Sequence, residues 1–318
     1  MDALFMEDVF KLEPEYSFSC NISVSKNTSY CHIAISQLYN TVYIGYPHIK
    51  SILAFDLEGN YLYCFKIVIP KIILGKFCQI SENILCVSEL HSRVSRAHLI
   101  TNEGILITTI MYGKYSRRII DCFSSEKHQI FYIVSESGVD SFGKEGMQQI
   151  EAINNFIQPA KTIKGICIKD DDMNLVLRVG CRWFSFWYIY YAQENRLDEI
   201  QINIEQFNDI VAFQDYIIFT DNEYEGENLA ICNLHSKNVK YIDEHGRACF
   251  TTRKIGYHIR IHIASRKLYT KVIRGTVVKV YNLDDLLRMY EEISNKVSES
   301  TVDDKECEDY CNCLYHMF

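Results

Sequence analysis

A strand-like apolar segment recurs along most of the chain, and this repeat is the feature that most constrains the fold. Successive segments, aligned on one anchor residue each, are separated by 43, 46, 44, 41 and 52 residues. The anchors are Tyr43, Cys86, Tyr132, Val176, Ile217 and Tyr269. A second short strand precedes each anchor across a polar turn, so every unit is expected to contain a hairpin. In the first two units the pattern predicts two further strands after the anchor.

Units of four short antiparallel strands, repeated about every 40 to 50 residues, are typical of the blades of a β-propeller. The six anchors therefore predict an all-β fold, a six-bladed β-propeller. Residues 16–24 lie outside the first unit and place Phe18, Cys20 and Ile22 on one strand face. We expect this segment to supply a closing strand to the last blade.

The pattern divides the chain into an N-terminal segment at residues 1–15, the propeller at 16–282, a short C-terminal helix at 283–297 and an acidic, cysteine-containing tail at 298–318. The helix is predicted because Leu286, Met289, Tyr290 and Ile293 recur at helical spacing on one face. Asn282 or Asp284 is placed to cap it. The tail is polar and acidic, so we expect it to be mobile.

Two stretches of the chain resemble the NHL repeat. They are residues 42–65, VYIGYPHIKSILAFDLEGNYLYCF, and residues 85–106, LCVSELHSRVSRAHLITNEGIL. The first two units carry the resemblance, and the later units share its period and strand pattern. The resemblance implies an NHL-like six-bladed propeller that serves as a platform for proteins or, in the TRIM-NHL group, for single-stranded RNA.

The sequence begins with acidic and apolar residues rather than a basic secretory signal, and no apolar run approaches the roughly 20 residues that span a bilayer. We therefore expect a soluble intracellular protein, cytoplasmic or nuclear, without membrane contact. Its 13 cysteines are then expected to be reduced thiols. No small-molecule cofactor is expected. The tail residues Cys307, Cys311, Cys313 and His316 are zinc-ligand types, but their spacing does not match paired zinc ligands, so no metal site is predicted.

The sharpest asymmetry along the chain is electrostatic. The net charge is −8, yet residues 246–281 contain nine basic residues and no acidic one. Within this stretch His258, Arg260 and His262 alternate with apolar residues, which predicts a strand with one cationic face. A solvated face balanced by neighbouring acidic blades is the favoured explanation of such a stripe, and a surface that binds nucleic acid or an acidic partner is the alternative. The candidate binding residues are Arg253, Lys254, His258, Arg260, His262, Arg266, Lys267, Lys271 and Arg274.

We favour a non-catalytic interaction scaffold that binds a protein partner within a larger complex. Apolar residues at helical spacing near both ends of the chain are candidate docking residues; they are Leu4, Phe5, Val9, Phe10, Leu286, Met289, Tyr290 and Ile293. The first alternative is an RNA-binding propeller that uses the basic surface of the last blade. The second is a channel-centred, metal-dependent hydrolase, whose acidic ligands converge from separate blades. No catalytic motif is found, so no catalytic residue is assigned.

Overall fold

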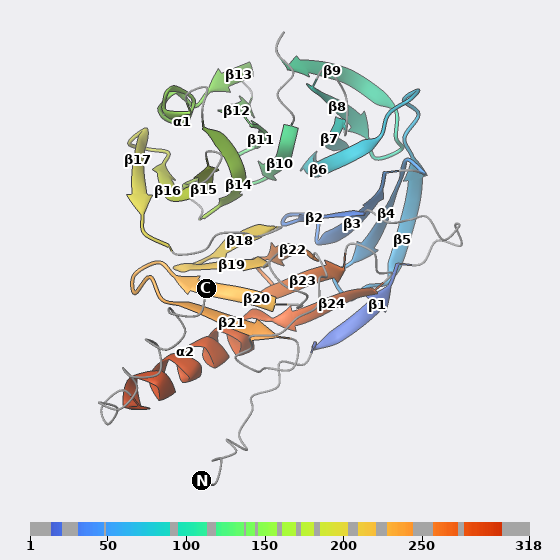
Figure 1. Cartoon of the computed structure of the whole chain (residues 1–318). Helices are drawn as coiled ribbons and strands as arrows, with labels where there is room; N and C mark the ends of the chain where they lie inside the picture. The colour runs from blue at the N-terminus through green and yellow to red at the C-terminus, as the bar shows by residue number, and fades with distance from the viewer. Residues whose placement is uncertain are drawn as a thin grey trace, which may run out of the picture.

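Six antiparallel sheets of four strands each are arranged around a common centre in the computed structural model (Figure 1). The predicted six-bladed β-propeller is therefore confirmed. The structure describes residues 14–20, 31–47, 49–89, 95–112, 119–136, 138–143, 146–157, 161–169, 173–180, 185–202, 209–220, 228–243, 257–272 and 277–300. The blades are numbered in chain order, from blade one at residues 32–66 to blade six, which contains the last strand.

The first three blades are continuous in sequence. Blade one contains β2 (His32–Ser36), β3 (Thr41–Tyr46), β4 (Ser51–Asp56) and β5 (Tyr61–Lys66). Blade two contains β6 (Leu74–Ser81), β7 (Ile84–Glu89), β8 (Ser95–Thr101) and β9 (Leu106–Tyr112). Blade three contains β10 (Ile119–Ser125), β11 (Ile130–Ser135), β12 (Gly138–Gly143) and β13 (Gly146–Gln149).

The next two blades repeat this order, and the last one does not. Blade four contains β14 (Thr162–Ile168), β15 (Leu175–Gly180), β16 (Ser185–Tyr191) and β17 (Arg196–Ile200). Blade five contains β18 (Ile210–Phe213), β19 (Tyr216–Thr220), β20 (Asn228–Asn233) and β21 (Val239–Asp243). Blade six contains β22 (Tyr257–His262), β23 (Lys267–Val272) and β24 (Val277–Asn282), with β1 (Tyr16–Ser19) as its outer strand.

Strand β1 closes the ring, as the sequence predicts. It pairs antiparallel with β24, and Tyr16 lies opposite Val280. The closure also reaches blade one, because the Tyr269 hydroxyl donates to the backbone oxygen of Leu57 over 3.0 Å. The first and last parts of the propeller are thus joined by backbone and side-chain hydrogen bonds.

The first strands of all blades meet at the centre of the ring. Each of β2, β6, β10, β14, β18 and β22 contacts the first strands of both neighbouring blades. The second strand of a blade is covered on both faces by the adjacent blades, which explains why β3 is buried throughout. Val42 and Ile44 pack in a cluster with residues of blade six, whereas Tyr43, between them, packs with blade two.

Helix α1 (Glu151–Phe156) follows blade three, and α2 (Leu283–Ser300) follows blade six. The sequence pattern does not predict α1, because six residues are too short to show a helical period. The predicted cap of α2 is Asn282, whose Oδ1 accepts a hydrogen bond of 2.8 Å from the backbone N–H of Asp284. Neither of these two helices, within the residues described, is long and apolar enough to cross a membrane.

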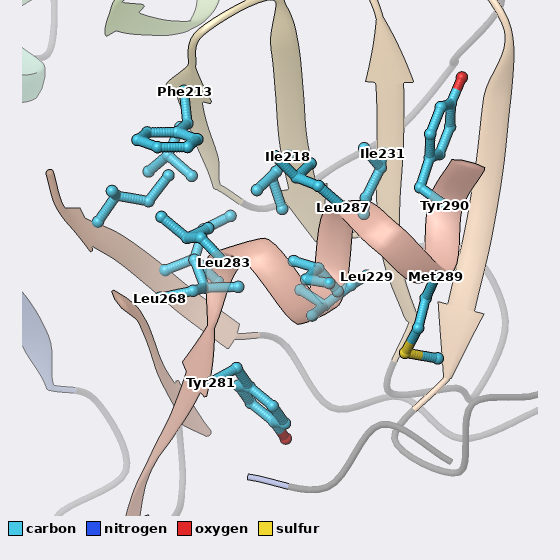
Figure 2. Close-up of a cluster of buried hydrophobic side chains, with 14 residues drawn as sticks. Phe213, Ile218, Leu229, Ile231, Leu268, Tyr281, Leu283, Leu287, Met289 and Tyr290 are labelled. Atoms are coloured by element: carbon cyan, nitrogen blue, oxygen red, sulfur yellow. The ribbon is translucent and has the colours of Figure 1, made fainter. Parts of the chain in front are cut away.

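The apolar face of α2 is buried against blades five and six (Figure 2). Leu286, Met289 and Tyr290 belong to one core cluster with residues such as Ile231 and Leu268. The Tyr290 hydroxyl donates to the backbone oxygen of Asn238 over 2.8 Å. The prediction that these three residues dock a partner is therefore wrong, because their faces are already occupied within the chain. The side chain of Ile293 lies outside the described part.

Gly104 turns the chain between β8 and β9 against the end of blade one, and it provides a test of this packing. Its φ of 84° lies in the left-handed region, and an added Cβ would collide with the backbone oxygen of Lys66. We expect Gly104→Ala to lower the free energy of unfolding by about 1 to 3 kcal/mol in urea denaturation.

Gly143→Ala is the matched control. A Cβ there meets only Ile130 at 3.5 Å, an ordinary contact, and no left-handed φ is required. Its free energy of unfolding should change by less than about 0.5 kcal/mol. Equal losses of the free energy of unfolding in the two variants would show that the close approach of blade two to blade one does not require glycine at position 104.

Candidate functional site

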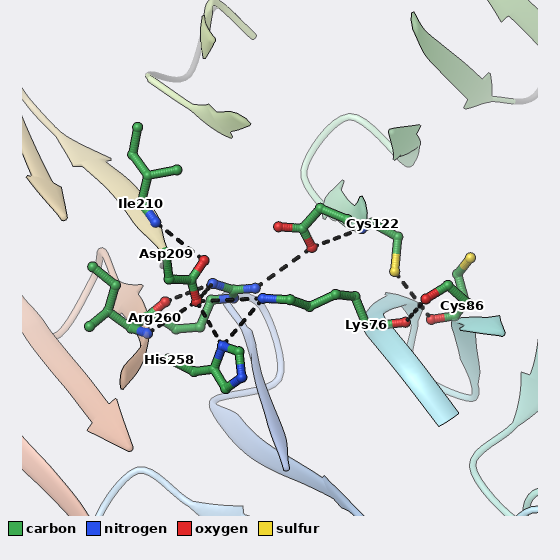
Figure 3. A network of polar contacts seen from close by, with 10 residues as sticks. Lys76, Cys86, Cys122, Asp209, Ile210, His258 and Arg260 are labelled. Atoms are coloured by element: carbon green, nitrogen blue, oxygen red, sulfur yellow. Dashed lines mark hydrogen bonds and ion pairs between the residues drawn. The ribbon is translucent and has the colours of Figure 1, made fainter. Parts of the chain in front are cut away.

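A cluster of charged and polar side chains occupies the centre of the ring, where five blades contribute (Figure 3). We call it the central cluster. It consists of His32 on β2, Lys76 on β6, Asp121 on β10, Asp209 immediately before β18, and His258 and Arg260 on β22.

The carboxylate of Asp209 is the focus of the cluster. Its Oδ2 lies 2.8 Å from Arg260 Nη1, 3.3 Å from His258 Nδ1 and 3.6 Å from Lys76 Nζ. The same oxygen accepts the backbone N–H of Ile259 over 3.2 Å. One oxygen, in a side chain that is 4% exposed, thus connects blades two, five and six.

Arg260 extends the connection to blade three. Its Nη2 lies 3.7 Å from Asp121 Oδ1, and that carboxylate oxygen also accepts the backbone N–H of Cys122 over 2.9 Å. Two cations and two carboxylates are therefore interleaved around the centre, an arrangement that offsets the cost of burying each of them.

Local backbone irregularities place two of these side chains. The pairing of β6 with β7 shifts register between Leu74 and Phe77, which brackets Lys76. The pairing of β10 with β11 shifts between Ile119 and Asp121. A bulge turns a side chain away from the direction that regular alternation would give it. The two shifts occur at similar places in their strands, near the start of the first strand of the blade.

The charges of the cluster reinforce one another. Burial alone would raise the pKa of Asp209, but the Arg260 guanidinium and the Lys76 ammonium overcome it and hold that pKa well below its usual value. Burial likewise would lower the pKa of Arg260, and the carboxylates of Asp209 and Asp121 raise it instead. Asp121 is different, because burial keeps its pKa raised despite the nearby cations.

Two histidines complete the cluster in their neutral form. Burial, followed by the nearby Lys76 ammonium, lowers the pKa of His258 to about 4. Burial and the neighbouring His258 lower the pKa of His32 well below its usual value. The two rings lie 4.9 Å apart between centroids. Both ring nitrogens of His32 are buried without a hydrogen-bond partner among the described residues.

The structure corrects the predicted basic stripe. The alternation along β22 is as predicted, but His258 and His262 are buried, and so is Lys271 on the adjacent strand. His262 Nδ1 lies 2.7 Å from the Ser265 hydroxyl instead of facing solvent. Lys271 lies beside Cys31. Burial raises the pKa of the Cys31 thiol, and the charge of Lys271 opposes that rise only in part. These residues do not form an exposed cationic face, because in a propeller both faces of a strand are covered by neighbouring blades.

The remaining cations of the predicted stripe that the structure describes are paired with carboxylates. Arg260 is committed to the central cluster. Arg266 Nε lies 2.8 Å from Asp284 Oδ1, and Lys267 Nζ lies 3.4 Å from Glu15 Oε1. Three groups of predicted residues lie outside the described part of the chain. They are the basic residues Arg253, Lys254 and Arg274, the docking candidates Leu4, Phe5, Val9 and Phe10, and the tail residues Cys307, Cys311, Cys313 and His316.

The sequence pattern does not predict four members of the central cluster, because they are single polar residues spread over almost 180 positions. These four are His32, Lys76, Asp121 and Asp209. A signal was nevertheless present. Each of them interrupts or precedes an otherwise apolar segment that becomes the first strand of a blade. Comparing the first strands of the units with one another would have placed all four at the centre.

The positive and negative side chains of the central cluster offset one another. Both of its carboxylates contact the Arg260 guanidinium. Among the described residues, no group of three or more His, Cys, Asp and Glu side chains is arranged to hold a metal ion. The cluster therefore forms a structural tie between blades two, three, five and six.

Comparison with known proteins supports the fold. No protein-family model matches the chain, and no curated protein matches it in sequence. Among solved structures, hydrazine synthase of Kuenenia stuttgartiensis is similar with a TM-score of 0.58 and 12% identity, over 85% of this chain and 81% of that one. Virginiamycin B lyase from Staphylococcus aureus is similar with a TM-score of 0.54 and 10% identity, over 78% and 79%.

A structure of a nidogen/laminin complex is similar with a TM-score of 0.51 and 9% identity, over 66% of this chain and 78% of that one. Two of these three structures are named for enzymes and one for a complex between proteins. At such low identity the similarity concerns the fold alone. The chain is a six-bladed β-propeller.

Removing the charge of Asp209 tests the role of the central cluster. In Asp209→Asn the cations of Arg260 and Lys76 lose their closest counter-ion in a buried site, and we expect the free energy of unfolding to fall by about 3 to 5 kcal/mol. The control is Asp198→Asn, which breaks the exposed 2.7 Å ion pair with Arg196 and should cost less than about 1 kcal/mol. A loss at Asp209 no larger than at Asp198 would contradict a structural tie.

The neutral His258 predicts a dependence of stability on pH. Its folded-state pKa of about 4 lies below the value of about 6.5 in an unfolded chain, so the unfolded state takes up the proton first as the pH falls. Above pH 6.5 the neutral His258 contributes roughly 3 kcal/mol to the free energy of unfolding, and this contribution is lost as the pH falls from 6.5 to 4. Urea denaturation across this range measures the loss.

His258→Gln should make that pH dependence shallower without abolishing it, because burial also lowers the pKa of His32, His98 and His262. The raised pKa of Asp121 acts in the opposite direction. The exposed His235 is the control, and His235→Gln should leave the slope unchanged. An unchanged slope in His258→Gln would refute the assignment.

Proposed function

We propose that this chain is a non-catalytic interaction scaffold whose propeller binds a protein partner within a larger complex. The observation that supports it is a pair of exposed apolar side chains on one face of the ring. Leu38, in the turn between β2 and β3, is 60% exposed, and Ile263, in the turn between β22 and β23, is 50% exposed. Both turns join the first and second strands of their blades, so they lie on the same face.

Gln37 joins these two turns directly. Its Nε2 donates to the backbone oxygen of Ile261 over 2.6 Å, and its Oε1 accepts the backbone N–H of Ile263 over 2.8 Å. Blades one and six are adjacent in the ring through β2 and β22. The apolar tips of the two turns are therefore held beside each other.

Glu126 fixes the Leu38 turn from a third blade. Its Oε2 accepts the backbone N–H of Leu38 over 2.7 Å and the Ser36 hydroxyl over 2.9 Å. The Ser36 hydroxyl in turn accepts the backbone N–H of Tyr39 over 2.9 Å. Contacts from blades one, three and six thus hold this turn in one conformation.

Apolar side chains are uncommon at the tips of tight turns, where Gly, Asn, Asp and Ser usually occur. Leu38 and Ile263 lose contact with water only if another molecule covers them. Because the turns are already fixed, a partner that covers them orders little extra backbone on binding, which favours affinity. The proposed partner is a protein that presents apolar side chains to this face.

The two alternatives receive less support. RNA binding rested on a basic stripe, and the cations of that stripe in the described part are buried or paired with carboxylates. A metal-dependent hydrolase rested on acidic ligands that converge on the centre. Asp121 and Asp209 do converge there, but Arg260 contacts both of them.

The test compares the tagged protein with Leu38→Asp, Ile263→Asp and the double variant. Each is purified from its own cells at moderate salt, once with and once without nuclease, and the bound proteins and RNA are identified and quantified. We expect one stoichiometric partner, reduced at least about tenfold in the double variant, because central interface residues commonly contribute 2 kcal/mol or more. The control is Leu62→Asp, an equally exposed apolar site on the outer strand of blade one.

Thermal unfolding of each variant should remain close to that of the unchanged protein, since the substituted side chains face solvent. Retention of the partner by the double variant would contradict the proposal for this face. Recovery of RNA that is lost to nuclease or high salt, without a stoichiometric protein, would favour the nucleic-acid alternative instead.

A further inference from the structure

The outer strand of blade two, β9, has an unusual edge. It pairs with β8 on one side, and no described strand pairs with its other side. Its sequence, LITTIMY, spans seven residues without a charge. An unpaired edge of this kind presents a row of free backbone N–H and C=O groups to any chain that can add a strand.

Large apolar side chains surround this edge. Ile107 is 50% exposed and Met111 is 64% exposed, and Leu106 and Ile105 are also exposed. Val68 joins them from the end of blade one, where its backbone N–H donates to the oxygen of Gly104 over 3.1 Å. Several exposed large apolar side chains on one strand are typical of an interaction site.

The other outer strands carry the protection that natural proteins use at edges, namely charged side chains or short length. Strand β17 contains Arg196, Asp198 and Glu199, β21 contains Lys240 and Asp243, and β5 contains Lys66. Strands β13 and β1 are four residues long. Among the six outer strands, all of which the structure describes, β9 is the longest, with seven residues. The other outer strands of five or more residues, β5, β17 and β21, each contain a charged residue.

We propose that β9 pairs antiparallel with β9 of a second copy of this chain, about a twofold axis at the middle of the strand. Directly opposed residues of an antiparallel pair have side chains on the same face, so the axis passes between one residue and the same residue of the second copy. With the axis at Thr109, Ile107 lies opposite Met111 of the second copy and Thr108 opposite Ile110. With the axis at Ile110, in the middle of the regular stretch 108–112, Thr109 lies opposite Met111.

A second copy fits this edge better than an unrelated strand for two reasons. Either register places only uncharged residues opposite one another, so self-pairing brings no like charges together. A twofold pair also closes on itself, because each copy covers the edge of the other and leaves no β9 edge free. The turns that carry Leu38 and Ile263 lie near the centre of one face, away from this rim, so the inference does not depend on the proposed function.

Association can be tested by measuring the mass in solution over a concentration series, by light scattering coupled to size-exclusion chromatography. The purified chain should form a dimer, and Thr109→Lys should weaken it at least tenfold, because two ammonium groups would then lie at or beside the twofold axis. Leu62→Lys, on the outer strand of blade one, is the control and should leave the dimer unchanged. A monomer at every concentration up to about 100 µM, or an open series of larger assemblies, would overturn the proposal.

Cysteine substitution tests the register independently. In a Cys64→Ser background, which removes an exposed thiol, residues 108 to 111 are replaced by cysteine one at a time. Opposed Cα atoms in an antiparallel pair are about 4.5 to 5.5 Å apart, within the range of a disulfide. Thr109→Cys or Ile110→Cys should therefore give a covalent dimer on mild oxidation, and Leu62→Cys should not. A dimer that persists in Thr109→Lys and cross-links at neither central position would also overturn the proposal.

Discussion

The contact between the Asp209 carboxylate and its surrounding cations is the interaction on which the centre of the ring depends. Six blades brought around one axis place their first strands together, and the polar side chains of those strands have little water available. Asp209 accepts from Arg260 and the backbone of blade six and lies near Lys76 of blade two. Each charge is tolerated there because the others are present, so the cluster is stable only as a unit.

The ion pairs in the described part of the chain determine how few cations of the predicted basic stripe remain unpaired on its surface. Cations that the sequence places in a single basic stretch are distributed between the centre, the closing strand and the start of α2. The described surface is therefore distinguished less by a charged field than by its apolar sites. Two such sites are the turns that carry Leu38 and Ile263, which join first and second strands, and the edge of β9, an outer strand.

The sequence predicts the architecture better than the site. The period, the closing strand and the Asn282 cap depend on local patterns, which single units display. The alternation of polar and apolar residues along β22 is equally visible in the sequence. It does not show that the polar face of the strand is also covered by a neighbouring blade. Helical periodicity predicts the apolar face of α2, but it does not show what covers that face. A neighbouring blade and another protein would give the same sequence pattern. Lys76 and Asp209 meet only through the tertiary fold.

The closing strand also sets the order of events during synthesis. Strand β1 ends at Ser19 and its partner β24 begins at Val277, so at 5 to 20 residues per second about 10 to 50 s pass before the partner exists. A hairpin forms in microseconds, so each inner blade can pair as soon as its own strands emerge. The sixth blade cannot, because its outer strand is made first and its other three last. Translation speed, rather than the rate of strand pairing, therefore limits when the ring can close.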